Sequence, residues 1–205
     1  MTHGDNSGLV LPPRIAPVQV IVVPVAQHKP GVIEKATELY EKLKAAGVRV
    51  KIDTSDNSLG WTCAQYEMKG VPLRVELGPK DIENGVCMAV CRHNGEKISV
   101  ALDEVTSRVG ELLDVVQQGL YDKAKKNLDE HCYVAHSVEE AAQIQQEKGG
   151  FIKTMWCGDL ACELEMKEKA GMSSRCIPFK QEELGETCVC CGKKAKHMIY
   201  WGVAY

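Results

Sequence analysis

Four charged residues at and just after a predicted strand, residues 73–77, could together hold a flat polar ligand such as a nucleotide base. The alternation of that strand places Arg74 and Glu76 on one face. A Gly-Pro dipeptide then ends the strand, so we expect Lys80 and Asp81 at its tip. Strand tips and the loops after them usually carry the binding residues of an α/β sheet. A solvated edge with ordinary ion pairs is the competing interpretation, because surface charges are common and mostly inert.

Five of the ten cysteines fall in two short polar clusters, which favours a metal site over scattered core thiols. Cys157 and Cys162 form the first cluster, and Cys188, Cys190 and Cys191 form the second. Two thiolates from each cluster would complete a tetrahedral zinc site of four cysteines, which is closed and therefore structural. The spacing Cys188-x-x-Cys191, followed by glycine, is that of a zinc knuckle and favours Cys191 over Cys190 as the fourth ligand. A catalytic thiol is not favoured, since no histidine lies in a recognisable Cys/His signature.

Composition limits the classes of partner. The chain has 205 residues and a net charge of only −3, so any RNA contact must come from a local basic patch rather than from a global field. There is no apolar signal segment and no run long enough to cross a bilayer, which predicts no membrane partner. A cytoplasmic, reducing compartment fits the ten cysteines better than a secreted disulfide framework.

The elements that must position these residues follow from hydrophobic periodicity and turn signals. A helix opened by Pro30-Gly31 and ended at Gly47 separates the first two strands, which makes a parallel crossover unit. Ser58 is a plausible N-cap for a second helix, and Asn94-Gly95 predicts a hairpin. The expected strands are residues 18–23, 48–52, 73–77, 86–91 and 97–101. An apolar stripe over residues 102–120 predicts a long helix. The fold class is therefore α/β, a mixed five-stranded sheet with flanking helices.

The rest of the chain differs in character. A short helix capped by Ser137 and running through Ile144, a strand at 151–156 and a terminal strand at 198–205 are expected there, with loops dominating between them. A segment of this kind often depends on a metal for stability. We expect a linker at residues 1–17, a first domain at 18–120 and a small α+β zinc-binding domain at 121–205.

Four blocks of sequence, in order along the whole chain, carry a family resemblance. They are HGDNSGLVLPPRIAP from His3, GWTCAQYEMKGVPLRVELGPKD from Gly60, CGDLAC from Cys157 and GVAY ending at Tyr205. Together they resemble the C-terminal portion of prolyl-tRNA synthetase of the eukaryotic and archaeal type. The resemblance implies a class IIa anticodon-binding fold followed by a C-terminal zinc-binding domain.

The resemblance also implies roles for single residues. The positions that match the family's base-reading residues are Glu67, Arg74, Lys80 and Asp81. Proline anticodons end in two guanines, whose Watson-Crick edge offers donors to a carboxylate and whose other edge offers acceptors to Arg or Lys. The family's zinc site uses the same two cysteine clusters, and its second pair varies in spacing, which leaves Cys190 against Cys191 open.

For the parent enzyme, the resemblance implies a homodimeric, cytoplasmic ligase that attaches proline to its tRNA with ATP and Mg²⁺. The motifs that bind ATP and proline are missing from this sequence, so we expect the chain to catalyse nothing alone. The second domain is expected to pack on the parent's own catalytic core, with the carboxylate of Tyr205 directed toward the active site. Met1 need not be a natural start.

Two alternatives of another class stay open from the sequence. The clustered cysteines could serve a thiol oxidoreductase, which disulfide count against metal content would distinguish. The chain could also be a freestanding zinc interaction module, which binding to an anticodon loop would exclude.

Overall fold

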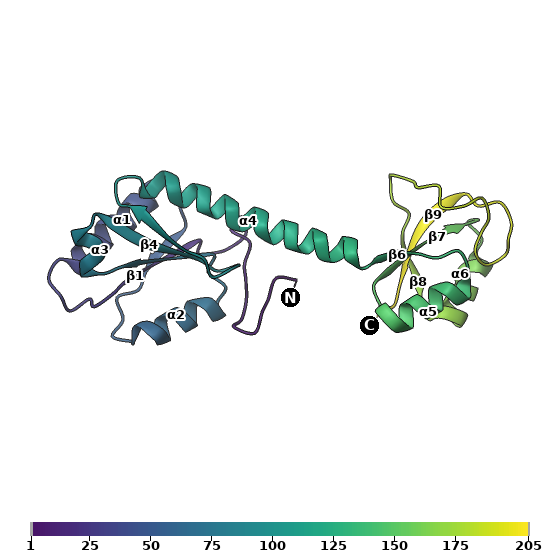
Figure 1. Cartoon of the computed structure of the whole chain (residues 1–205), viewed down its shortest axis with the longest axis horizontal. Helices are drawn as coiled ribbons and strands as arrows, with labels where there is room; N and C mark the ends of the chain where they lie inside the picture. Colours follow the sequence, from purple (N-terminus) through teal and green to yellow (C-terminus); the bar gives the residue numbers. More distant parts are fainter. Residues whose placement is uncertain (1, 205) are drawn as a thin grey trace. The chain divides into compact units, whose positions relative to one another are not determined.

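The structure is a computed structural model of the chain and describes residues 2–204. The chain forms two compact units, one up to Ala124 and one from Lys125 (Figure 1). Tyr205, whose carboxylate was expected to face an active site, lies outside the described residues.

The first unit is built on a five-stranded sheet in the order β2-β1-β3-β4-β5. Its strands are β1 (Val20–Pro24), β2 (Val50–Ile52), β3 (Leu73–Leu77), β4 (Val86–Cys91) and β5 (Lys97–Ala101). β1 pairs in parallel with β2 and β3, whereas β4 is antiparallel to β3 and β5. The predicted mixed five-stranded sheet is therefore confirmed, with β2 beginning two residues later than expected.

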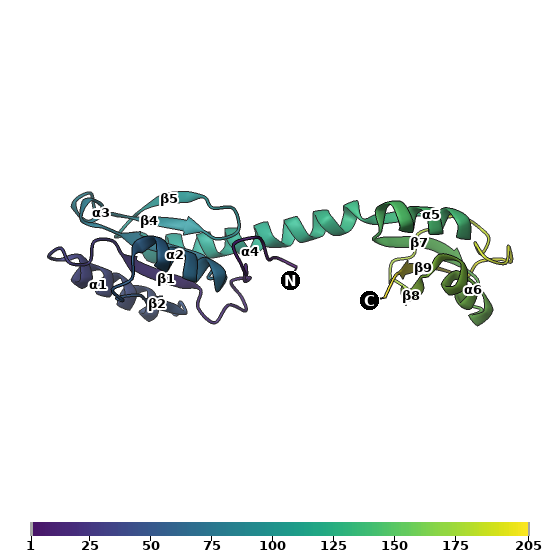
Figure 2. The same ribbon diagram turned by 90° about the horizontal axis from the view of Figure 1, so that it is seen from below.

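Helices cover the two faces of this sheet unequally. The helices are α1 (Val32–Ala45), α2 (Leu59–Met68), α3 (Pro79–Glu83) and α4 (Val105–Glu130). α1 and α4 bury one face with residues such as Leu39, Leu43 and Val116, and α2 lies on the other face, where Tyr66 packs near Ile21 (Figures 1 and 2). Because α2 covers only part of its face, the side chains of β3 beside it remain partly accessible.

The short helix α3 was not predicted from the sequence. It follows Gly78 directly, and the Asp81 carboxylate accepts a hydrogen bond from the Gly78 amide at 2.8 Å, which caps the first turn. Five residues are too few for a 3.6-residue periodicity to be recognised. Lys80 and Asp81 thus lie on a helix rather than on a bare strand tip.

The N-terminal segment, expected as a linker, lies against the first unit. It contains no helix or named strand over residues 2–17, yet Val10 and Ala16 are buried. The guanidinium of Arg49 donates to the carbonyl oxygens of Ala16 at 2.8 Å and Pro13 at 2.7 Å. These contacts hold the segment on the surface of the unit without regular secondary structure.

The second unit contains a four-stranded sheet in the order β6-β7-β9-β8 with two helices. Its elements are β6 (Cys132–Val134), α5 (Val138–Lys148), β7 (Phe151–Trp156), α6 (Leu160–Ala170), β8 (Ser173–Cys176) and β9 (His197–Gly202). Ile152, Met166 and Trp201 lie in its core. The buried indole of Trp201 donates to the Thr154 hydroxyl at 2.9 Å, which satisfies both polar groups.

Two helices and one strand of this unit differ from expectation. α5 begins after Ser137 as predicted but continues beyond Ile144 to Lys148. α6 was not predicted, because only Cys162 and Met166 of this helix are buried, which leaves no recognisable apolar stripe. β9 ends at Gly202, earlier than the expected terminal strand.

Within residues 2–204, no helix combines the length and the apolar character required to cross a bilayer.

Candidate functional site

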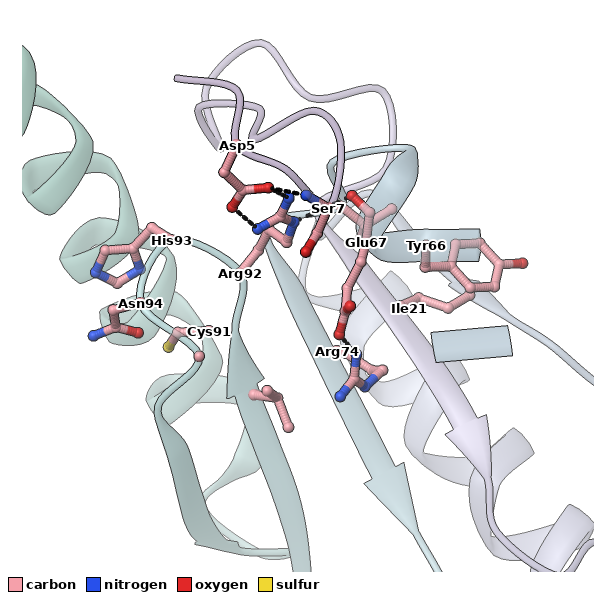
Figure 3. Close-up of a pocket in the computed structure, with 13 residues that line it drawn as sticks. Asp5, Ser7, Ile21, Tyr66, Glu67, Arg74, Cys91, Arg92, His93 and Asn94 are labelled. Carbon is pink, nitrogen blue, oxygen red and sulfur yellow. Dashed lines mark hydrogen bonds and ion pairs between the residues drawn. The ribbon is translucent and has the colours of Figure 1, made fainter. Parts of the chain in front are cut away.

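A cation held between two carboxylates marks the exposed part of the sheet surface beside α2. Arg74 on β3 donates from Nη1 to Glu67 Oε1 at 2.7 Å and from Nε to Glu76 Oε1 at 2.8 Å. The Arg74 side chain is 12% exposed and that of Glu67 39%. Figure 3 shows Glu67 reaching from the end of α2 toward Arg74. The cluster is therefore preformed by two different elements.

Strand alternation explains why these side chains share a face. Leu73, Val75 and Leu77 are buried in the core beneath α1 and α4, so the intervening residues of β3 point to the opposite face. There Arg74 lies opposite Ile21 of β1 and Val90 of β4. The predicted common face of Arg74 and Glu76 is confirmed by this burial pattern.

A pocket of about 370 Å³ opens beside the cluster. The N-terminal segment, α2, β3 and the end of β4 contribute its polar lining, which includes Asp5, Tyr66, Glu67, Arg74, Arg92 and His93 (Figure 3). Guanidinium donors and carboxylate acceptors within one pocket can satisfy both edges of a heteroaromatic base. The pocket thus has the chemistry expected of a base-binding site.

Lys80 and Asp81 are not part of this pocket. Both lie on α3, beyond the carboxyl end of β3; Lys80 is exposed, and Asp81 caps the helix through the Gly78 amide. The structure therefore brings Glu67 and Arg74 together and leaves Lys80 and Asp81 apart from them on α3, after the carboxyl end of β3.

Two residues that line the pocket, Asp5 and Arg92, escaped the sequence analysis as site residues. Glu76 was expected on the face of Arg74, but its contact with Arg74 depends on the rotamers of both side chains. Asp5 and Arg92 are 87 positions apart, and no local pattern connects them. Only the folded chain places the Arg92 guanidinium on the Asp5 carboxylate.

The charges of the cluster reinforce one another. Burial opposes the charged form of Arg74, but the hydrogen bonds that its guanidinium donates to the Glu67 and Glu76 carboxylates outweigh burial and raise the Arg74 pKa. The Cys63 thiol lies 3.9 Å from Glu76 Oε1, and burial raises the pKa of Cys63. At neutral pH the Cys63 thiol is therefore protonated and the Arg74 guanidinium beside it is charged.

A second site is formed by four cysteines of the second unit. The Sγ atoms of Cys157, Cys162, Cys188 and Cys191 all lie within 4.8 Å of one another. Sγ of Cys157 is 3.6 Å from that of Cys162 and 3.7 Å from that of Cys191. A tetrahedral zinc ion with zinc-sulfur bonds of about 2.3 Å requires sulfur-sulfur separations of about 3.8 Å. The donor set and its dimensions fit a zinc ion.

Local backbone geometry selects Cys191 rather than Cys190 for this cluster. Gly192 has a φ of 69°, and its amide donates to the Cys188 carbonyl at 3.0 Å, which closes the turn between the two thiols. The Cys190 side chain instead approaches the carbonyl oxygen of Cys162, with Sγ 3.3 Å away. Within the described residues, Cys190 is therefore the spare thiol of its cluster.

Backbone amides of the same turn also favour the thiolate form of Cys188. Burial opposes ionisation of Cys188, but backbone amides of Cys191 and Cys190 donate to its sulfur and lower the Cys188 pKa to about 7. Burial raises the pKa of Cys190 to about 12. Amides that face a sulfur stabilise the form of cysteine that binds metals.

Two family models match the chain. The model described as anticodon binding domain matches residues 19–112, and the model described as prolyl-tRNA synthetase, C-terminal, matches residues 138–205. Together they cover both structural units, and neither describes a thiol oxidoreductase.

Curated relatives match along the entire chain. A proline-tRNA ligase of Lachnoclostridium phytofermentans is 56% identical over 205 residues, one of Clostridium botulinum is 57% identical and one of Clostridium novyi is 55% identical over the same length. Each alignment covers 100% of this chain and 43% of the relative. The chain thus spans less than half the length of these relatives.

Proposed function

Because the chain belongs to the anticodon-binding domain family in its first unit and to the prolyl-tRNA synthetase C-terminal family in its second, we propose that it is the anticodon-reading and zinc-binding portion of a proline-tRNA ligase. Its macromolecular partner is then the anticodon loop of proline tRNA. Sequence-specific RNA recognition usually targets unstacked loop bases, which a pocket on a sheet can receive.

The observation that carries this proposal is the pairing of Arg74 with Glu67 at the edge of the 370 Å³ pocket. A guanine could accept from the guanidinium through O6 and N7 and donate to a carboxylate from its Watson-Crick edge. Lys80 and Asp81 offer the same pair of charges at a second place, on α3. We propose that the two pairs read the two guanines of the proline anticodon.

We also propose a structural zinc ion held by Cys157, Cys162, Cys188 and Cys191. The four-thiol donor set and the sulfur-sulfur distances of 3.6 and 3.7 Å support zinc. The metal would fix β7, the start of α6 and the loop before β9 to one another.

The properties of the whole ligase are proposals as well. The intact enzyme would attach proline to its tRNA with ATP and Mg²⁺ bound in a catalytic core, as a cytoplasmic homodimer, and the second unit would pack on that core. For this chain we propose a linker at 1–17, an anticodon-binding domain at 18–120 and a zinc-binding domain at 121–205. The last buried residue of α4 is Leu120, which supports the boundary.

Binding of short RNA hairpins to the purified 205-residue chain tests the proposal. One hairpin carries the two guanines of the proline anticodon, and the other carries adenines in their place. The wild-type chain should prefer the guanine hairpin, and Arg74→Ala should reduce that preference by about 1 to 3 kcal/mol for a lost bidentate contact.

A matched control distinguishes recognition from general attraction. Lys35 is an exposed, ion-paired cation on α1, far in sequence from the pocket residues, and Lys35→Ala should leave the preference unchanged. Equal affinity of the wild-type chain for both hairpins would refute base reading by this unit.

A further inference from the structure

The side chain of Arg92 ties three parts of the first unit together. Its Nη1 and Nη2 atoms donate to the two carboxylate oxygens of Asp5, each at 2.6 Å, and its Nε donates to the carbonyl oxygen of Glu67 at 3.1 Å. The Arg92 side chain is only 8% exposed. Figure 3 shows the Asp5 carboxylate facing this guanidinium above the end of β4. A bidentate pair of this kind fixes orientation as well as distance.

Residues 5–11 form a strap over the last turn of α2. The Leu9 amide donates to the Met68 carbonyl and the Leu11 amide donates to the Gly70 carbonyl, both at 3.1 Å. A Cβ atom on Gly8 would lie 2.5 Å from Met68 Cα, so only a residue without a side chain allows the strap to lie this close to the end of α2. The Asp5 carboxylate, at the start of the strap, is the part that reaches Arg92.

The same helical turn carries Glu67. Arg92 holds the Glu67 carbonyl, and the Glu67 carboxylate extends from that fixed point to Arg74 at 2.7 Å. Loss of the Arg92 contact would free the end of α2 to move relative to β3. A displacement of about 1 Å is enough to spoil a recognition pair that depends on hydrogen-bond geometry.

We propose that Arg92 and Asp5 are positioning residues for base recognition, which set the place of the Glu67 carboxylate without contacting the base. This inference rests on the proposed function, because it assigns a role within the same pocket. The hydrogen bond from Arg92 also keeps the pKa of Asp5 well below its usual range, so the pair remains charged across the neutral range. The strap thereby contributes to base recognition through Asp5, which holds Arg92 in place, although no residue of the strap is proposed to contact the base.

The test uses the 205-residue chain and the same two RNA hairpins. Asp5→Asn and Arg92→Lys should each lower the preference for guanine over adenine by about five- to tenfold, since they weaken one positioned contact. Arg49→Lys is the matched control, because Arg49 also holds the N-terminal segment but contacts Pro13 and Ala16 instead of Asp5. That variant should keep the full preference.

A second readout separates positioning from stability. In a Glu67→Gln background, Arg92→Lys should cause no further loss of preference, because its effect passes through Glu67. If Asp5→Asn and Arg92→Lys weaken both hairpins equally, or leave the ratio intact, the inference is overturned while wild-type discrimination still supports the proposed function. If the wild-type chain does not discriminate, the proposed function fails and this inference fails with it.

Discussion

Arg74 on β3 and Glu67 on α2 meet with 2.7 Å between Nη1 and Oε1, and Glu76 occupies the Nε side of the same guanidinium at 2.8 Å. The cation is thus shared between a carboxylate from the strand and one from the helix. A ligand that enters the pocket encounters a charge arrangement that is already formed. Preformed groups lose little conformational entropy on binding, which favours affinity for a ligand of matching polarity.

The shared cation should also stabilise the first unit. Arg74→Met keeps most of the side-chain volume but leaves Glu67 and Glu76 without their partner, so we expect a loss of about 1 to 3 kcal/mol in the free energy of unfolding. Urea titration followed by circular dichroism measures this loss. The control is Arg108→Met, which breaks an exposed pair with Glu111 and should cost less than about 0.5 kcal/mol. Equal losses in the two variants would contradict the claim that the contacts of Arg74 with Glu67 and Glu76 stabilise the first unit more than an exposed ion pair does.

Elemental analysis should find one zinc ion per chain. Cys191→Ser should lower the zinc content sharply, because its Sγ is 3.7 Å from that of Cys157 within the four-thiol cluster. Cys190→Ser should retain the zinc, since that side chain faces the Cys162 carbonyl instead. The opposite sensitivity of the two variants would assign Cys190 as the ligand.

Removal of the zinc should loosen the second unit selectively. A structural site contributes its binding free energy to folding, so a chelator should lower the melting temperature of the second unit and increase amide exchange in the loop before β9. Amides of β1 and β3 in the first unit serve as the internal reference. An unchanged melting curve in metal-free protein would rule out a structural role for the metal.

Substitution of Gly8 should disrupt the strap. Gly8 has a φ of 131°, and a Cβ there would lie 2.5 Å from Met68 Cα, so Gly8→Ala must displace backbone. We expect a loss above about 2 kcal/mol in unfolding free energy, because strain and clash add. Gly85→Ala is the control: its φ is 67°, but nothing lies within 4 Å of the added atom, so only the left-handed conformation costs about 1 kcal/mol.

His93 should make the first unit sensitive to mild acid. Its Nδ1 is buried without a hydrogen-bond partner among the described residues, and burial lowers its pKa, with Lys123 acting in the same direction and Glu96 opposing. The unfolded chain then binds the proton more readily than the folded one. The stability that neutral His93 provides is therefore present above its ordinary pKa of about 6.5 and is lost as the pH falls below that value.

Replacement by a ring that does not titrate checks this prediction. His93→Phe should flatten the decline in unfolding free energy between about pH 7 and pH 5, measured by urea titration at each pH. A slope identical to that of the wild-type chain would mean that other groups cause the acid sensitivity.

Local pattern was sufficient to predict much of the chain. Alternation over Leu73–Leu77 predicted which side chains of β3 face the core, and Asn94-Gly95 predicted the hairpin between β4 and β5. These features depend on residues that are close in sequence, where the periods of strands and helices link spacing directly to direction. The glycine after Cys191 likewise indicated a tight turn, and Gly192 adopts the left-handed conformation that such a turn needs.

Tertiary structure decided what spacing leaves open. Spacing groups Arg74 with Glu76, Lys80 and Asp81, and the family resemblance adds Glu67. The packing of α2 on the sheet places the Glu67 carboxylate on Arg74 and leaves Lys80 and Asp81 on α3. The Asp5 to Arg92 pair joins the N-terminal segment to the end of β4, and no local period spans 87 residues. Contacts of this kind depend on how separately formed elements dock, because distances between elements are set by packing of the whole core rather than by the order of residues within one element.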